Sequence, residues 1–330
     1  MDYSQVLTDS LRAAIGVPAI VYALAAIGLN VQFGYTGLLN FGHVGFLLMG
    51  AYGTAISVAE WGLPLLVAFF VGLASAALLA LLLGLPTLRL RAEYLAIVTI
   101  SAAEILRIVV RSGTFESFTG GPQGVGGFAD AFFDLNPIAD GSYGIGAVEF
   151  SERQLWVMVV GWVLVGLMVL VTRQLVDSPW GRVLRAIRED EDAVRSLGKN
   201  VFAYKLQSLV VGGVIGGLAG IVLSVDANFV DPAFWRPIVT FFVYTALILG
   251  GVGRVVGPVA GAMLFWFVLQ AFDTLLRQAV TPDSWAGGFI AQSDLGLVRF
   301  ALVGFALVLL VVFRPQGMFG RKEEASIDVR

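Results

Sequence analysis

The sequence contains no cysteine and a single histidine among its 330 residues. Disulfide bridges and thiolate metal sites are therefore excluded, and one imidazole cannot build a multi-histidine metal centre. We accordingly expect neither a metal nor a cofactor. Charge is scarce as well, since only 14% of the residues are Asp, Glu, Lys or Arg, against about a quarter in soluble domains. The net charge of -3 and the lack of a basic stripe give no support to nucleic-acid binding.

Motifs for nucleotide binding and catalysis are also missing. No G-x-x-x-x-G-K-[ST] loop occurs, because Gly198-Lys199 lacks both the upstream glycine and the following Ser or Thr. No activated nucleophile and no carboxylate pair suited to acid–base catalysis is evident. An intramembrane prenyltransferase would need spaced aspartate pairs in two motifs, whereas 189–192 is one contiguous acidic run. We therefore do not expect an enzyme.

Apolar sequence is abundant, with 58% hydrophobic residues and a mean hydropathy of +0.85. This predicts an all-α polytopic membrane protein of about nine transmembrane or partly broken helices, folded as one domain over residues 1–330. The charge-free run from Ala13 to Ala59 can cross twice, with a polar, glycine-rich break at 30–37. The further predicted spans are 64–85, 93–111, 153–173, 206–225, 237–253, 256–274 and 295–313.

Basic residues are distributed unevenly over these spans. Threading the chain places 14 of its 21 Lys and Arg on one side, together with the segment 176–205 and the tail 314–330. Because Lys and Arg favour the cytoplasmic side, we expect the carboxyl terminus inside and the amino terminus outside. The loop 112–152 is then extracytoplasmic. The first ten residues lack the basic region of a signal peptide, so the first apolar run is expected to remain as a span.

The charged segment 176–205 carries helix start and stop signals. Ser178 is a good N-cap, and Pro179 suits the first helical position. The acidic run 189–192 suits the start of a second helix, and Gly198 can end it in a left-handed conformation. We predict two short amphipathic helices, with Trp180, Val183, Leu184 and Ile187 on one face and Arg182, Arg185 and Arg188 opposite. The plainer alternative is a solvated connector.

Glycines and polar residues also lie inside the apolar runs. The four-residue spacing of glycines over 212–220 favours close helix packing over a binding role. Tyr35, Asn40 and His43 lie within apolar sequence, where polar groups line a cavity or bond neighbouring helices. Both interpretations stay open. Glu104 lies three residues before Arg107, which predicts a local ion pair.

Several stretches together resemble the LivM-type permease subunits of branched-chain amino acid ABC importers, within the wider Liv and urea permease group. They follow the family order from about residue 30 to 320, and together they are specific although each alone is weak. The stretches are GYTGLLNFGHVGF at 34–46, GAY at 50–52, EYLAIVTI at 93–100, EILR at 104–107, TGGPQG at 119–124, SPWGRVLRAIRED at 178–190, LGGVGRVVGPVAG at 249–261 and FRPQGMFG at 313–320.

This resemblance implies a permease subunit in the plasma membrane of a prokaryote that translocates branched-chain amino acids. It implies a LivH-like second permease subunit, two cytoplasmic ABC ATPases that supply the energy, and an extracytoplasmic solute-binding protein. The family's ATPase-coupling element maps onto Gly181, Arg182, Arg185, Ala186, Glu189, Asp190, Ala193, Leu197 and Gly198. The chain keeps the glycine of the broader ABC-permease loop but departs from its Glu-Ala-Ala opening. Expected near the translocation path are Tyr35, Asn40, His43 and Tyr94.

Two alternatives remain open at this point. An ABC permease for urea or short amides would carry the same architecture. An ATP-independent secondary transporter would need a buried carboxylate network, but the spans supply only Glu93 and Glu104.

Overall fold

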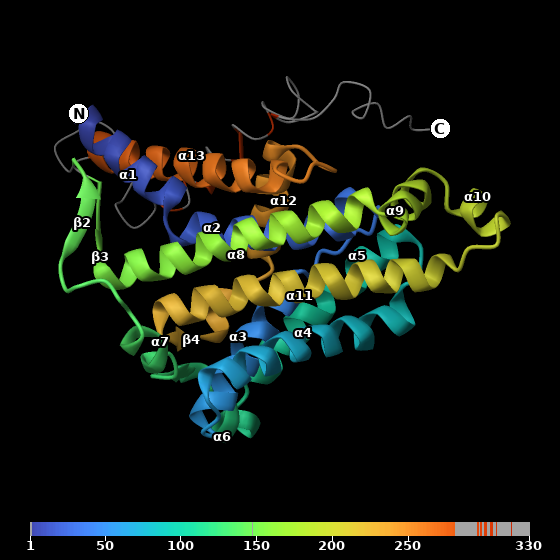
Figure 1. Ribbon diagram of the computed structural model, residues 1–330, viewed down its shortest axis with the longest axis horizontal. Coiled ribbons are helices and arrows are strands. Elements are labelled where there is room, and N and C mark those ends of the chain that lie inside the picture. Colours follow the sequence, from blue (N-terminus) through green and yellow to red (C-terminus); the bar gives the residue numbers. More distant parts are fainter. Residues whose placement is uncertain are drawn as a thin grey trace.

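The computed structural model describes residues 2–146 and 148–280, together with isolated positions between 296 and 318. Helices dominate this part of the chain, which confirms the all-α class (Figure 1). The longer helices are α1 (Tyr3–Ile15), α2 (Val17–Leu29), α3 (Val44–Ala59), α4 (Leu65–Thr87), α5 (Ala92–Arg111), α8 (Glu152–Asp177), α9 (Pro179–Glu189), α11 (Val201–Ala227), α12 (Ile238–Gly250) and α13 (Gly257–Ala279). Apart from the isolated positions, the predicted span 295–313 and tail 314–330 lie outside the described residues.

The helices are those of a polytopic membrane protein. Among the described residues, five are long and apolar enough to cross a bilayer, namely Val17–Gly34, Leu65–Thr87, Glu152–Asp177, Val201–Ala227 and Gly257–Ala279. The apolar helices α3 and α12 are shorter, with 16 and 13 residues. Helix α5 covers the predicted span 93–111, but Glu93, Glu104, Arg107 and Arg111 make it less apolar.

The predicted break inside the first apolar run is present and has a defined form. Helix α2 continues into a π-helical turn, η1 (Asn30–Gly34), and an irregular stretch follows until α3 begins at Val44. A π-helical turn widens the backbone by one residue and is frequent at functional sites. We call residues 30–43 the polar break.

Helix α11 lies at the centre of the bundle and packs against α2, α3 and α4. Its glycines make this possible, because a Cβ on Gly212 would overlap the carbonyl of Gly28 and a Cβ on Gly220 would overlap that of Leu47. Backbone therefore meets backbone, as small residues allow between membrane helices. The packing interpretation of the 212–220 glycines is confirmed.

The segment 112–152 folds into short elements at one end of the bundle (Figure 1). They are η2 (Gly113–Phe115), α6 (Glu116–Thr119), η3 (Gly121–Gln123), β1 (Val125–Gly126), α7 (Asp130–Asp134), β2 (Ser142–Ile145) and β3 (Val148–Ser151). Strands β2 and β3 form an antiparallel hairpin. Strand β1 pairs with β4 (Phe229–Val230), which follows α11 and precedes η4 (Pro232–Trp235). The sequence patterns did not predict these strands.

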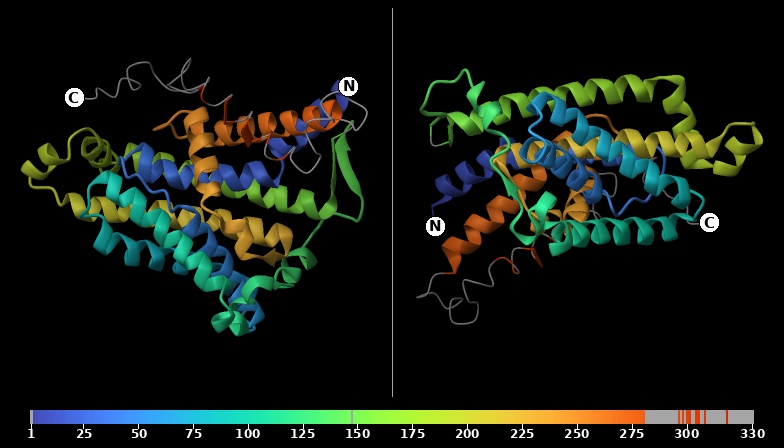
Figure 2. Two further views of the ribbon diagram at one scale, coloured as in Figure 1. Left: turned by 180° about the vertical axis from the view of Figure 1, so that it is seen from behind. Right: turned by 90° about the horizontal axis from the view of Figure 1, so that it is seen from below.

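Helix α1 was also not predicted, since its sequence is only weakly apolar. It lies alongside α13 near the amino terminus (Figure 2). Asp2 caps it by accepting hydrogen bonds from the amides of Ser4 and Gln5.

Candidate functional site

The charged segment stands at the end of the bundle opposite the β2–β3 hairpin, where it forms α9 and α10 (Glu191–Ser196) (Figure 1). Helix α9 begins at Pro179 with Ser178 in the N-cap position, as predicted. The Ser178 hydroxyl does not cap the helix, however, because it donates a 2.6 Å hydrogen bond to the carbonyl of Leu175. The predicted helix pair is therefore present, although the Ser178 hydroxyl bonds the preceding helix α8 instead of the first turn of α9.

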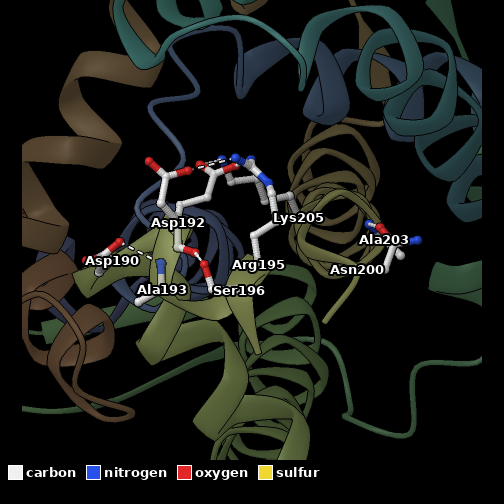
Figure 3. Close-up of polar contacts among 9 residues, drawn as sticks. Asp190, Asp192, Ala193, Arg195, Ser196, Asn200, Ala203 and Lys205 are labelled. Carbon is white, nitrogen blue, oxygen red and sulfur yellow. Dashed lines mark hydrogen bonds and ion pairs between the residues drawn. The ribbon is translucent and has the colours of Figure 1, made fainter. Parts of the chain in front are cut away.

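Helix α10 is fixed by a small polar network at its start (Figure 3). The Asp190 carboxylate accepts a 2.9 Å hydrogen bond from the amide of Ala193 and serves as N-cap. Arg195 pairs with Glu191 at 2.8 Å and with Asp192 at 2.7 Å. Lys205, near the start of α11, pairs with Glu191 as well. These contacts tie α10 to the central helix of the bundle.

The end of α10 also follows the sequence pattern. Gly198 has a φ of +76°, the left-handed conformation in which glycine is favoured. The helix ends at Ser196, and the side chain of Leu197 is 80% exposed. An apolar side chain therefore stands at the tip of the segment.

The apolar face of α9 is buried, as predicted. Leu184 is fully buried in one cluster with Val176 and with Tyr35 of the polar break. Ile187 is buried in a second cluster with Val194 of α10 and Val201 of α11. The two clusters make the segment a packed unit rather than a solvated connector.

On the opposite, arginine-rich face of α9, two of the three arginines are hydrogen-bonded within the chain. Arg185 donates a 2.6 Å hydrogen bond to the carbonyl of Val176, and Arg188 donates to the carbonyl of Gly34 in η1. Gly181 is buried where a Cβ would overlap the carbonyl of Val176. Helix α9 is thus bonded and packed directly onto the polar break.

The nine residues expected to couple to an ATPase lie in this segment with different exposures. Seven of them have exposed side chains or backbone, Ala186 is half-buried and Gly181 is buried. The exposed residues are Arg182, Arg185, Glu189, Asp190, Ala193, Leu197 and Gly198.

Asn30 joins the polar break to the glycine-rich turn between α12 and α13. Its side-chain amide donates a 2.8 Å hydrogen bond to the carbonyl of Arg254, and its carbonyl oxygen accepts a 2.9 Å bond from the amide of Gly253. The turn can approach closely because Gly253 adopts a φ of +76° and carries no side chain. Two irregular segments more than 200 residues apart are therefore held together by one carboxamide.

Asn40 and His43 are buried and bonded to neighbouring backbone and side chains. Asn40 donates at 2.8 Å to Gln32, which in turn donates at 3.1 Å to the carbonyl of Leu209. The Asn40 oxygen accepts a 3.0 Å bond from the amide of Gly42. His43 Nε2 lies 3.0 Å from the carbonyl of Ala25. His43 therefore bonds the neighbouring helix α2, whereas the Asn40 side chain bonds other residues of the polar break.

Some polar atoms of the break have no hydrogen-bond partner among the described residues. These are the Tyr35 hydroxyl and His43 Nδ1, both buried. Buried polar groups are nearly always bonded, so these two atoms are exceptions within the described residues. Tyr35, Asn40 and His43 all belong to the polar break, but their contacts differ, since Tyr35 packs with Leu184 of α9 and His43 lies against Phe46 and Ala25.

Tyr94 is not part of this group. It lies on α5 with 58% of its surface exposed. On the same face are Ile97, Ser101, Ile105 and Ile108, all exposed. Glu104 and Arg107 flank this stripe and form the predicted ion pair, with bonds of 2.5 and 2.9 Å.

The α5 stripe differs from the other exposed helix faces. On α4, and on α8 between residues 155 and 172, the exposed residues are all apolar, such as Phe70 and Leu82 on α4 and Leu167 on α8. The α5 stripe adds Ser101 to its apolar residues, and the Glu104–Arg107 pair lies beside it. Polar groups at membrane depth face protein or water rather than lipid.

Other residues of the break were not singled out as site candidates. Asn30 and Gln32 organise it, and the hydroxyls of Thr36 and Ser208 meet at 2.7 Å. A signal was available, because Asn30, Gln32 and Asn40 are the only amide side chains in the charge-free run 13–59. The contribution of Ser208 comes from α11 and is not visible in local sequence.

Comparison with known proteins places this architecture in a family. Residues 12–312 match the model of the branched-chain amino acid transport system permease component. The chain is 32% identical to the high-affinity branched-chain amino acid transport system permease protein LivM of Salmonella typhimurium, over 92% of this chain and 69% of the relative. It is 25% identical to the probable LivM permease of Methanocaldococcus jannaschii, covering 92% and 91% of the two chains. It is also 25% identical to the permease protein LivH of Escherichia coli, over 93% of each.

The matched region includes the polar break, α5, the charged segment and the turn between α12 and α13. The chain belongs to the family of permease components of branched-chain amino acid transport systems.

Proposed function

We propose that this chain is the membrane permease subunit of an ABC importer that translocates branched-chain amino acids, driven by ATP hydrolysis on partner subunits. The observation that carries the proposal is the direct contact between α9 and the polar break. Arg188 bonds the Gly34 carbonyl, and Leu184 packs with Tyr35. A push on the charged segment therefore reaches the broken helix without an intervening flexible loop.

Two ABC ATPases are the partners that would supply this push. The sequence has no phosphate-binding loop, so the energy that shifts outward-facing to inward-facing states has to come from another chain. The exposed Leu197 at the tip of the segment suits insertion into a cleft of the ATPase, because an isolated exposed leucine gains free energy when covered. The exposed acidic residues Glu189 and Asp190 would orient this contact.

The solute path follows the exposed stripe on α5, against a LivH-like second permease subunit. Tyr94 and Ser101 then face the path, and the Glu104–Arg107 pair is shielded from lipid at the subunit interface. The polar break reaches α5 behind this stripe, where the amide of Phe41 donates a 3.1 Å hydrogen bond to the buried Thr99. A movement of the break would change the wall of the path through this contact.

The orientation in the membrane follows the distribution of basic residues. We infer one permease domain over 1–330 with its amino terminus outside, the segment 112–152 facing an extracytoplasmic solute-binding protein, and 176–205 and 314–330 in the cytoplasm. The basic charged segment and the 112–152 segment lie at opposite ends of the bundle, which agrees with this assignment (Figure 1).

Co-purification of ATPase activity tests the proposal. The tagged chain is isolated from native membranes together with its bound partners, and ATP hydrolysis in the eluate is measured. We expect ATPase activity with the wild-type chain and at least a tenfold loss with Leu197→Asp, because a carboxylate in an apolar cleft costs several kcal/mol.

Leu135→Asp is the matched control. Leu135 is 74% exposed and follows α7 at the opposite end of the bundle, so its replacement should leave the co-purified activity unchanged. A chain that brings no ATPase and still transports leucine in vesicles without ATP would refute the ABC assignment.

A further inference from the structure

A groove of about 770 Å³ opens beside the charged segment, between the α4–α5 turn and the start of α11. One wall is the turn, with Arg89, Leu90 and Arg91, and the other is α10 with the loop that leads to α11. Arg89 lies over the ring of Phe202, 5.8 Å from its centroid. None of the coupling or path residues proposed above lines this groove.

The charge in the groove is unbalanced. Arg89, Arg91, Arg195, Lys199 and Lys205 line it against only two carboxylates. Both carboxylates, Glu191 and Asp192, are already paired with Arg195 or Lys205.

Three cations remain without an anionic partner. Within residues 2–146 and 148–280, the side chains of Arg89, Arg91 and Lys199 form neither an ion pair nor a hydrogen bond. The groove is therefore electropositive and suited to an anion.

An apolar stripe leads directly into this groove. On α4 the exposed side chains of Leu78, Leu82 and Leu85 follow one another at helical spacing. Arg89 comes four residues after Leu85, where the stripe ends, and Leu90 is 42% exposed between the two arginines. A ligand that fills both features has an anionic group joined to long apolar chains.

We propose that this groove binds the phosphate of an anionic phospholipid, with the acyl chains lying along the exposed face of α4. Basic pockets beside membrane helices recognise lipid head groups in this way, and each Lys or Arg contributes about 1 kcal/mol. A free phosphate shares the anionic chemistry but has nothing to place against Leu82 and Leu85. The bound lipid would contact the charged segment directly, since α10 forms the other wall of the groove.

Native mass spectrometry of the purified full-length chain tests the assignment. The chain is offered equal amounts of phosphatidylglycerol and phosphatidylcholine with identical acyl chains, and the ratio of the two bound lipids is measured. We expect phosphatidylglycerol to dominate, and the double variant Arg89→Gln/Arg91→Gln to lower the ratio about thirtyfold, since two basic residues contribute about 2 kcal/mol and 1.4 kcal/mol is tenfold. An unchanged ratio in the double variant would overturn the proposal.

Lys199→Gln is a second variant on the opposite wall, in a loop where no packing is lost. It should lower the ratio about fivefold, the effect of one basic residue. Arg173→Gln is the control, because Arg173 also follows a lipid-facing stripe but lies 3.8 Å from Asp177. A loss in this control as large as in Lys199→Gln would mean that overall surface charge, and not the groove, selects the lipid.

Competition with inorganic phosphate tests whether the groove binds a lipid phosphate or a free phosphate ion. An excess of phosphate should leave the lipid adduct in place, because it cannot replace the contacts of the acyl chains. Displacement of the lipid by phosphate would assign the groove to the free anion and overturn the lipid assignment.

Discussion

At the scale of single residues, Asn30 connects two irregular segments of the chain. It is 1% exposed, and one carboxamide serves both a donor and an acceptor of the turn between α12 and α13. An asparagine side chain can do both, because its NH2 group donates and its carbonyl oxygen accepts. Asn30, at the start of the π-helical turn η1, therefore links the polar break to the turn between α12 and α13, although the two lie far apart in the sequence.

Replacing Asn30 tests how much its hydrogen bonds to the turn between α12 and α13 contribute to the stability of the fold. Asn30→Ala leaves the Gly253 amide and the Arg254 carbonyl without their partner, and we expect a loss of about 2–6 kcal/mol in stability, since each buried group left unsatisfied costs about 1–3 kcal/mol. The measurement is the thermal unfolding midpoint in detergent. Asn136→Ala, which removes bonds in the outer 112–152 segment, should shift the midpoint much less. Equal shifts in the two variants would contradict this role of Asn30.

Residue-level predictions from sequence succeeded where the signal was local. Glu104 and Arg107 pair because three residues on a helix bring them together, and Gly198 adopts the left-handed conformation that its position after α10 requires. Tyr94, expected near the translocation path with Tyr35, Asn40 and His43, is exposed on α5, whereas the other three are buried. The direction of a side chain on a helix depends on which neighbours cover the helix, and that information is not local.

At the scale of elements, the order of helices follows from apolar runs and caps, whereas their irregularities do not. The charged segment was predicted as two helices from Ser178, Pro179 and Gly198, and α9 and α10 have those ends. The π-helical form of η1 and the β1–β4 pair depend on contacts with α11, α12 and the turn after it. Long-range packing overrides local preference at these places.

The glycines of α11 give a prediction at this scale. Gly220→Ala places a Cβ against the carbonyl of Leu47 and should force α11 away from α3, lowering the thermal unfolding midpoint and the yield of monodisperse protein. Gly166→Ala in α8 is the matched control, since a Cβ there meets nothing within 4 Å. That control should be neutral or stabilising by about 1 kcal/mol, because alanine favours the helix. A Gly220→Ala variant as stable as the control would argue against tight packing.

At the scale of the whole molecule, the two ends of the bundle have different chemistry. One end carries the charged segment, and the other carries the short strands and helices of 112–152 (Figure 1). The positive-inside rule assigns the first end to the cytoplasm. The absence of cysteine makes this assignment easy to test, because any introduced thiol is unique.

Single-cysteine variants at the two ends report the orientation. In intact cells, a membrane-impermeant maleimide should label Leu135→Cys but not Leu197→Cys, and both should react after permeabilisation. The two side chains are 74% and 80% exposed in this chain, so access to the thiol does not limit either reaction when the chain is expressed without its ATPase partners. The reverse pattern would invert the topology and place the charged segment outside.

Helix α11 has a consequence for how the two ends communicate. Its 27 residues span about 40 Å at 1.5 Å per residue. Lys205 ties one end to α10, and β4 ties the other end to β1 of the 112–152 segment. Between these ends the glycines hold it against α2 and α3 without intervening side chains. Because a helix held in this way is stiff, we expect a displacement of its charged end to be transmitted along α11 to the opposite end of the bundle.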